Sequence, residues 1–91
     1  MTKILRAQAL REMEIKETPQ GKQKTFSIKF IKKNGEIVHL PKAVATGLKF
    51  DMKEHGFRGA VAVDNKYNPI SHVYPIHIDN IIEFNNATVK L

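Results

Sequence analysis

The residues of this chain with the widest chemical range are its histidines, because histidine can bind metals or act as a general base. There are four of them: His39, His55, His72 and His77. No two stand at the four-residue spacing that places both on one helical face, and no pattern of acidic ligands accompanies them. On a strand, His72 and His77 point to opposite faces unless Pro75 introduces a bulge. We therefore expect surface or half-buried histidines, with no metal and no cofactor.

Residues for hydrolytic chemistry are equally sparse. The only serines are Ser27 and Ser71, and there is no cysteine. Ser71 precedes His72, but neighbours on a strand face opposite ways, which works against a nucleophile–base hydrogen bond. Asp79 and Glu83 could act as an acid and a base, although carboxylates at a sheet edge more often keep that edge from pairing. The sequence predicts no catalytic residues, and we expect that the protein is not an enzyme.

Two short segments have some features of known binding motifs. DNKYN, at 64–68, does not fit a calcium loop, because Lys66 occupies a position that needs an oxygen ligand and the distal glutamate is missing. HGFRGAVAV, at 55–63, begins as RNA-recognition strands do, but Ala60 and Val61 replace the aromatic residues that would stack on bases. Neither segment predicts a binding site.

The net charge of the chain is +6, and it is unevenly distributed. Residues 1–33 hold nine Lys or Arg and three Glu, whereas residues 34–91 hold six residues of each sign. This skew suggests a basic face that meets a polyanion or an acidic partner through salt-sensitive contacts. Lysines at hairpin tips and edges also protect sheets from aggregation, which is the alternative explanation. The possible polyanion-binding residues are Lys3, Arg6, Arg11, Lys22, Lys24, Lys29, Lys32 and Lys33.

Length and composition exclude several classes of protein. A chain of 91 residues forms one domain with one modest core. The lack of cysteine removes a disulfide framework and favours a cytoplasmic setting, or a particle assembled inside the cell. No apolar run approaches the roughly 20 residues that span a bilayer, and the first residues lack the apolar stretch of a signal peptide. We expect no association with a membrane.

The element with the clearest signal is a β-hairpin within TFSIKFIKKNGEIVHL, residues 25–40. Asn34 and Gly35 mark its turn, and the loop could hold two residues or three. A two-residue loop sets Phe30 opposite His39 and scatters the apolar side chains over both faces of the sheet. That arrangement leaves no single face to bury.

A three-residue loop, at 33–35, gathers the apolar side chains on one face. It sets Phe30 opposite Val38, and Phe26 continues the same face. It also places Gly35 at the position where such loops require a left-handed residue. We predict this register.

The pattern of the first sixteen residues is ambiguous. Good helix formers favour a helix or an extended arm over 3–11, whereas alternating apolar and polar residues favour a strand near 11–17. In the second half, Pro75 places its part of a strand at an edge or a bulge. The other predicted elements are a linker at 18–24, helical turns at 41–47 and 51–56, strands at 58–64 and 70–78, a turn at 65–69, and a last hairpin that turns at 85–86.

These elements predict a mainly β fold. We expect a small barrel or curled antiparallel sheet of five to seven short strands, with one or two helical turns and an N-terminal arm. Residues 1–20 would be the basic arm, as helix or strand, and residues 21–91 a single small β domain. The predicted core consists of Phe26, Ile28, Phe30, Val38, Leu40, Val61, Val63, Val73, Ile76, Ile78, Ile82 and Phe84.

Without a catalytic signal, the leading hypothesis is a non-catalytic interaction or assembly module. An example would be a small structural subunit of a virion or of a mobile-element assembly. A small sheet with an extension can add a strand to the open edge of a neighbour, so we expect a protein partner or self-association. The alternative hypothesis is a nucleic-acid-binding protein that uses the basic first third for phosphate contacts.

Overall fold

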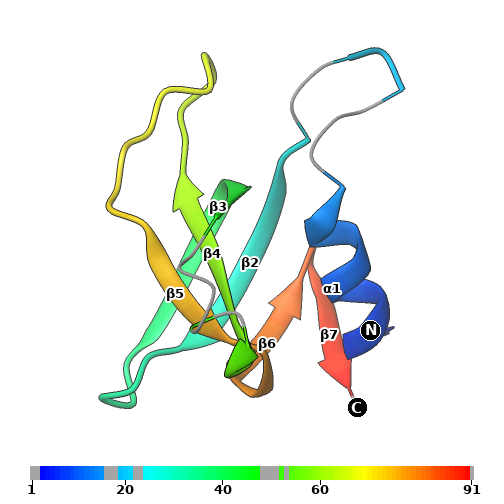
Figure 1. Ribbon diagram of the computed structural model, residues 1–91, viewed down its shortest axis with the longest axis vertical. Helices are drawn as coiled ribbons and strands as arrows, with labels where there is room; N and C mark the ends of the chain where they lie inside the picture. The colour runs from blue at the N-terminus through cyan, green and yellow to red at the C-terminus, as the bar shows by residue number, and fades with distance from the viewer. Residues whose placement is uncertain (1–2, 16–18, 22–23, 48–51, 53, 91) are drawn as a thin grey trace.

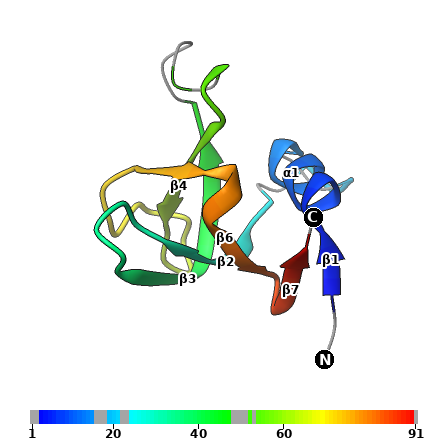
Figure 2. The same cartoon turned by 90° about the horizontal axis from the view of Figure 1, so that it is seen from below.

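The chain folds as one mixed, mostly antiparallel sheet with a short helix against one face (Figures 1 and 2). The structure is a computed structural model, and it describes residues 3–15, 19–21, 24–47, 52 and 54–90. The strand order is β1-β7-β6-β2-β3-β4-β5, and of the described strands only β1 and β7 pair in parallel. The elements are β1 (Lys3–Leu5), α1 (Arg6–Glu14), β2 (Phe26–Ile31), β3 (Ile37–Thr46), β4 (Phe57–Ala62), β5 (Tyr74–His77), the 3-10 turn η1 (Ile78–Asn80), β6 (Ile81–Phe84) and β7 (Ala87–Lys90).

The prediction of a mainly β fold is confirmed, but the predicted small barrel is wrong. The sheet is neither closed nor strongly curled, because its outermost strands, β1 and β5, do not pair with each other. An open sheet has edges whose backbone groups lack a partner strand, and such edges can pair with another chain. In the described part of the chain, no helix is long and apolar enough to cross a membrane.

The hairpin of β2 and β3 has the predicted register. Phe30 lies opposite Val38. The Lys32 N–H donates a hydrogen bond to the Glu36 carbonyl at 2.8 Å and so closes the loop. Gly35 has a φ of +88°, in the left-handed region. The three-residue loop is confirmed.

Replacing Gly35 by alanine is expected to lower the free energy of unfolding by about 1–2 kcal/mol, because an L residue is strained in the left-handed region. Nothing lies within 4 Å of the added methyl group, so the backbone conformation alone accounts for the loss. Gly47→Ala is the matched control, since its surroundings are equally open and its φ is not positive. Urea unfolding measures both variants, and equal stabilities would contradict the loop conformation.

β3 continues through a segment for which the sequence predicted a helical turn. The register of the β2–β3 ladder shifts between Leu40 and Ala43, where β3 carries an extra residue in a bulge. From Ala43 to Thr46 the strand pairs with β4. The helical turn predicted at 41–47 is therefore wrong. Pro41 is tolerated in the strand because a bulge leaves a backbone position without a ladder hydrogen bond.

Two other predicted turns are confirmed. In the segment 51–56, of which 51 and 53 lie outside the described residues, the His55 N–H donates to the Met52 carbonyl at 3.2 Å. Gly56 follows with a φ of +87°. The last hairpin turns at Asn85 and Asn86, whose φ angles of 50° and 66° are those of a tight hairpin turn.

Residues 3–14, which belong to the predicted arm, form β1 and α1. The strand predicted near 11–17 is wrong as far as the structure describes it, because α1 continues to Glu14. Ala9 and Met13 lie one helical turn apart, are 0% and 2% exposed, and belong to the same buried cluster as the sheet. A nine-residue helix is marginal by itself, so the packing of these two side chains stabilises it.

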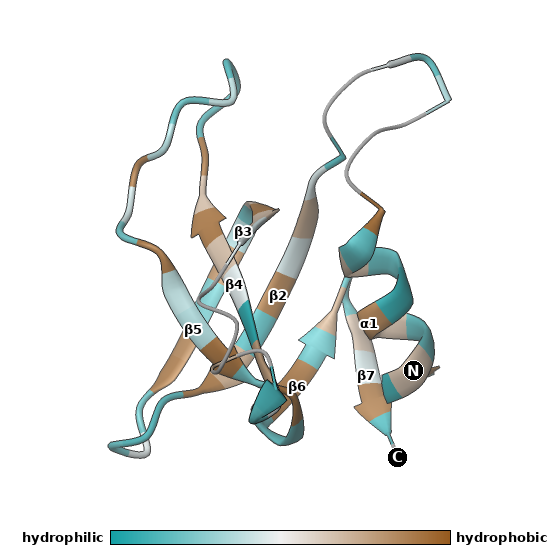
Figure 3. Ribbon diagram, in the orientation of Figure 1, coloured by the Kyte–Doolittle hydropathy of each residue, from teal (hydrophilic) through white to brown (hydrophobic). Residues whose placement is uncertain are grey.

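Most of the predicted core is buried, and apolar positions alternate with polar ones along β2 (Figure 3). Val38 is partly buried against this core, and Val61 and Val63 form a second, smaller cluster with Val44. The sequence missed the alanines of the core, Ala9, Ala43, Ala60, Ala62 and Ala87, because a small apolar side chain gives a weak periodic signal. The predicted core residues that are buried are Phe26, Ile28, Phe30, Leu40, Val61, Val63, Ile76 and Phe84.

Besides the half-buried Val38, three predicted core residues are not buried. Val73 is 43% exposed, and Ile78 and Ile82 are half-buried. The 3-10 turn η1 occupies Ile78–Asn80 and breaks the alternation that the sequence analysis carried through this segment. Ile81, the first residue of β6, is buried instead.

The predicted turn after β4 is organised by Asp64. Its carboxylate accepts hydrogen bonds from the backbone N–H groups of Asn68 at 2.9 Å and Lys66 at 2.8 Å. These two hydrogen bonds, that of Asn68 foremost, hold the pKa of Asp64 below its ordinary value of 3.8. The acidic residue of DNKYN therefore has a structural role in the turn.

The stabilising effect of Asp64 is expected to disappear in acid. Because its pKa is lower in the folded chain than in the unfolded one, its contribution is complete above the unfolded value and is lost as the pH falls through the folded value. The difference in free energy of unfolding between the wild type and Asp64→Asn should shrink as the pH falls below 3.8. Urea unfolding of both proteins over an acidic pH series measures it, and a constant difference would contradict the assignment.

Candidate interaction site

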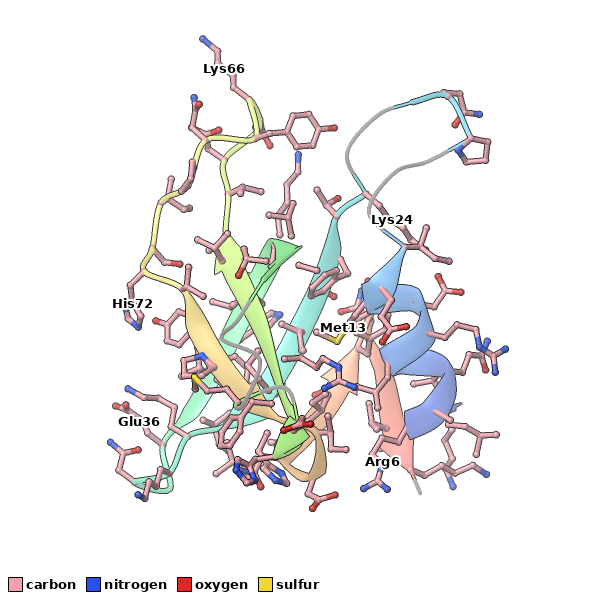
Figure 4. The ribbon with its side chains drawn as sticks, viewed as in Figure 1. Arg6, Met13, Lys24, Glu36, Lys66 and His72 are labelled. Atoms are coloured by element: carbon pink, nitrogen blue, oxygen red, sulfur yellow. The ribbon has the colours of Figure 1, made fainter. Side chains whose placement is uncertain are left out.

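Ser71 and His72 do not form a nucleophile–base pair. The Ser71 hydroxyl accepts a hydrogen bond from the Ala62 N–H at 3.0 Å and donates one to the His72 carbonyl at 2.9 Å. The His72 ring points to the outside of the molecule (Figure 4) and lies 4.1 Å from the Tyr74 ring, centroid to centroid. The hydroxyl thus satisfies a backbone N–H of β4.

Asp79 and Glu83, the carboxylates considered as an acid and a base, each contact a different basic side chain. Asp79 forms an ion pair with Arg6 of α1, and its backbone N–H donates to Nδ1 of His77 at 3.2 Å. Glu83 lies 2.8 Å from the ammonium group of Lys29. Among the residues that the structure describes, no three His, Asp or Glu side chains are close enough together to hold a metal ion.

Half of the predicted polyanion-binding residues contact carboxylates. Arg6 and Lys24 lie near opposite ends of α1 (Figure 4), and the other two pairs lie on the hairpin and the strand beside it. Exposed ion pairs of this kind contribute about 0–1 kcal/mol each, but they neutralise positive charge locally. The pairs are Arg6–Asp79, Lys24–Glu12, Lys29–Glu83 at 2.8 Å and Lys32–Glu36 at 3.5 Å.

The other predicted cations lie apart from one another. Lys3 is in β1, Arg11 is on α1 and Lys33 is in the hairpin loop. All three are exposed, and none has an ion pair within the described part of the chain. Both views of the ribbon place the hairpin loop far from α1 (Figures 1 and 2). Lys22 lies outside the described residues, so the structure does not gather the predicted basic residues on one face.

The two outer edges of the sheet are poorly suited to pairing with another strand. The Ile78 N–H donates to the Gly56 carbonyl at 2.9 Å, so Tyr74 and Ile76 face β4, and Pro75 and His77 face outward. Pro75 has no N–H to offer at this edge, as the sequence analysis expected of an edge position. The opposite edge, β1, is three residues long and carries an exposed lysine.

A third row of unpaired backbone groups runs along β3, which is longer than the strands beside it. On one side β3 pairs with β2 from Ile37 to Ala43. On the other side it pairs with β4 only from Ala43 to Thr46. No strand in the described part of the chain pairs with this second side over residues 37–41. We call this side of residues 37–41 the open edge.

The hydrogen bonds of the hairpin show which groups the open edge presents. The Glu36 carbonyl accepts a hydrogen bond from Lys32 and therefore faces β2. The alternation of a strand then turns the N–H and C=O groups of Ile37 and His39 away from β2. Both residues are exposed, and Pro41 ends the stretch. An extended segment needs such a row of donors and acceptors to add itself to a sheet.

A row of polar side chains begins at the open edge and crosses one face of the sheet. The side chains of Lys29 and Glu83 meet in it, beside a shallow depression of about 60 Å³ that Ser27 and Asn86 also line. This volume suits a few water molecules and not a substrate. Cross-strand pairing aligns the row in the order His39, Lys29, Glu83, Thr88 and Lys3.

Comparison with protein-family models, with curated proteins and with solved structures finds no match for this chain. The geometry of the chain itself is therefore the guide to its function. The feature that this geometry offers for binding is the open edge, together with the side chains that border it.

Proposed function

We propose that the protein is a non-catalytic interaction module, which binds an extended segment of a partner protein along the open edge of β3. The observation that carries the proposal is the row of N–H and C=O groups at Ile37 and His39, which have no partner strand in the part of the chain that the structure describes. Ile37 lies opposite Ile31, and the two side chains are 61% and 38% exposed. A strand added here gains backbone hydrogen bonds and covers part of this apolar pair.

The contrast between the edges supports the proposal. Sheets usually protect an edge with a proline, a charge, a bulge or a very short strand. β5 has Pro75 at its centre, and β1 is short and carries Lys3. The open edge has Pro41 only at its end, and it presents an exposed isoleucine. An edge whose proline and bulge stand only at its end is suited to assembly, such as the role of a small subunit in a virion or a mobile-element complex.

NMR titration with a designed peptide tests the proposal. The core of the peptide is Thr-Val-Gln-Val-Ile, which in antiparallel pairing sets apolar residues opposite Ile37 and Val38. We expect chemical-shift changes along β3 and slower amide exchange at Ile37 and His39, with no change along β1 or β5. Changes confined to β1 or β5 would contradict the proposal.

Two substitutions at His39 distinguish the contribution of its backbone N–H to peptide binding from that of its side chain. His39→Pro removes an N–H of the open edge without removing a hydrogen bond to β2, so we expect peptide binding to be lost. His39→Ala keeps that N–H and is the matched control, which should still bind. Urea unfolding verifies that both variants are folded. Equal affinities of the two folded variants would contradict strand addition.

The second candidate function is nucleic-acid binding. It is favoured by Lys3, Arg11 and Lys33, which are exposed and form no ion pair in the described part of the chain. Fluorescence anisotropy with a random DNA duplex and a random RNA strand tests it across a salt series. Support requires binding that weakens log-linearly with salt and that is lost when these three residues become glutamine. Lys29→Glu is unsuitable, because it would set a second carboxylate beside Glu83.

A further inference from the structure

Three basic side chains that form no ion pair in the described part of the chain border the open edge. Lys33 is exposed in the loop before β3, His39 lies in the middle of the edge, and Lys42 follows its last residue. The Lys42 ammonium group lies 4.8 Å from the centroid of the Tyr67 ring and helps to lower the pKa of Asp64 through its charge, but it forms no ion pair in the described part of the chain. Positive charges therefore stand near both ends of the line that an added strand would take, at Lys33 and Lys42.

An added antiparallel strand would place its side chains in register with those of β3. The residue opposite His39 would lie on the same face as that histidine, at the end of the polar row. Two positions further along, a residue would lie opposite Ile37, which is 61% exposed. The residue between them would lie opposite Val38, which packs against the core. The edge thus sets a different requirement at each of three successive positions.

We infer that the segment that binds to the open edge is acidic, with a carboxylate opposite His39 followed by two aliphatic residues opposite Val38 and Ile37. This inference rests on the proposed function and names the chemistry of the partner. The positive charges of Lys33 and Lys42 on either side of this position attract a carboxylate, because opposite charges across neighbouring strands stabilise pairing and like charges destabilise it. A lysine at the position of the carboxylate would lie between Lys33 and Lys42 and be repelled.

A second copy of the chain fits the open edge less well. Each copy carries a net charge of +6 and would bring the same basic side chains to the contact. Antiparallel pairing about the centre of the edge would set two copies of His39 face to face. It would also set Ile37 opposite Pro41, which has no N–H for the Ile37 carbonyl.

Three peptides that differ at one residue test the inference. Their cores are Thr-Val-Glu-Val-Ile, Thr-Val-Gln-Val-Ile and Thr-Val-Lys-Val-Ile, each with a fluorescent label and blocked ends. At low salt the Glu peptide is expected to bind about tenfold more tightly than the Lys peptide, with the Gln peptide between them. At about 1 M salt the three affinities should converge, because the Debye length falls to about 3 Å.

A pair of lysine substitutions shows which positive charge causes the preference for the Glu peptide. Lys42→Gln is expected to reduce the preference for the Glu peptide about two- to threefold and to leave the Gln peptide unaffected. Lys3→Gln is the matched control, because Lys3 is exposed in β1, which lies four strands away from β3 in the sheet. Equal effects of the two substitutions would contradict a local role of Lys42.

The outcomes distinguish the inference from the proposed function. If all three peptides bind equally and protect the amides of Ile37 and His39, the inference is wrong and the proposed function stands. Tighter binding of the Lys peptide also overturns the inference alone. If none of the peptides binds, both fail. A dimer that protects the same amides without any peptide would replace the acidic segment by a second copy as the occupant.

Discussion

Phe30→Ala is expected to lower the free energy of unfolding by about 3–5 kcal/mol, which is the usual loss for truncating a buried aromatic side chain. Phe30 is 2% exposed, and its ring packs against the ring of Tyr74 with the centroids 5.5 Å apart. The contact joins β2 to the edge strand β5. Since a domain is stabilised by about 5–15 kcal/mol in total, the variant should be close to unfolding at room temperature.

Ile31→Ala is the matched control for Phe30→Ala. Ile31 is the next residue of β2, points to the opposite face and is 38% exposed. Its truncation should cost about 1 kcal/mol or less, because little apolar surface returns to water. Urea unfolding followed by circular dichroism measures both variants. A larger loss for Ile31→Ala would mean that the two faces of β2 are exchanged.

Ala9→Asp is expected to lower the free energy of unfolding by a similar amount, because it disturbs the packing of α1 against the sheet. Ala9 is 0% exposed between α1 and the sheet, and an unpaired charge buried there costs about 3–5 kcal/mol. Undocking of α1 limits this cost, because the carboxylate then reaches water. We therefore expect reduced stability together with loss of amide protection along α1.

Ala7→Asp provides the comparison for Ala9→Asp. Ala7 is exposed on the same helix, close to its N-terminus, where a carboxylate interacts favourably with the helix dipole. This variant should be as stable as the wild type. If both variants were equally stable, residues 3–14 would behave as an undocked arm.

The packing of α1 changes how assembly can be tested. Deletion of residues 1–16 would remove Ala9 and Met13 from the core as well as β1 from the sheet. A truncated chain that fails to assemble could therefore simply have failed to fold. Substitutions at the open edge, such as those at His39, avoid this difficulty.

The sequence was most informative where the relevant contacts are local. The register of the β2–β3 hairpin follows from the alternation around Phe30 and from one glycine in the loop, and both are visible within sixteen residues. The edge position of Pro75 follows likewise from its missing N–H. These features depend on one or two neighbouring elements and not on the topology of the sheet.

The topology itself could not be predicted, because it depends on pairings between distant segments. β1 pairs with β7 at the other end of the chain, and this pairing makes the sheet mixed and leaves it open. Pro41 indicated the start of a helical turn, but the buried neighbours Ala43 and Val44 hold the segment in β3. In this segment, tertiary packing overrides the local preference for a helical turn.

The candidate site also combines features that are visible in the local sequence with features that depend on contacts between distant segments. The basic first third is evident in the sequence, but Arg6 and Lys29 meet Asp79 and Glu83, which lie more than fifty residues away along the chain. Charge summed along a sequence therefore does not give the charge on a surface. The open edge is not evident in the sequence, because its signal is a mismatch in length between β3 and β4. That mismatch appears only once the pairing is known.

Amide hydrogen exchange of Ile37 and His39, measured by NMR without and with the Glu peptide, tests the proposed function most directly. In the free protein we predict fast exchange at these two residues and protection at Val38 and Leu40, which face β2. A saturating amount of the peptide should slow exchange at Ile37 and His39 by about tenfold or more. Protection of these two amides in the free monomer, or unchanged exchange with the peptide bound, would contradict strand addition at the open edge.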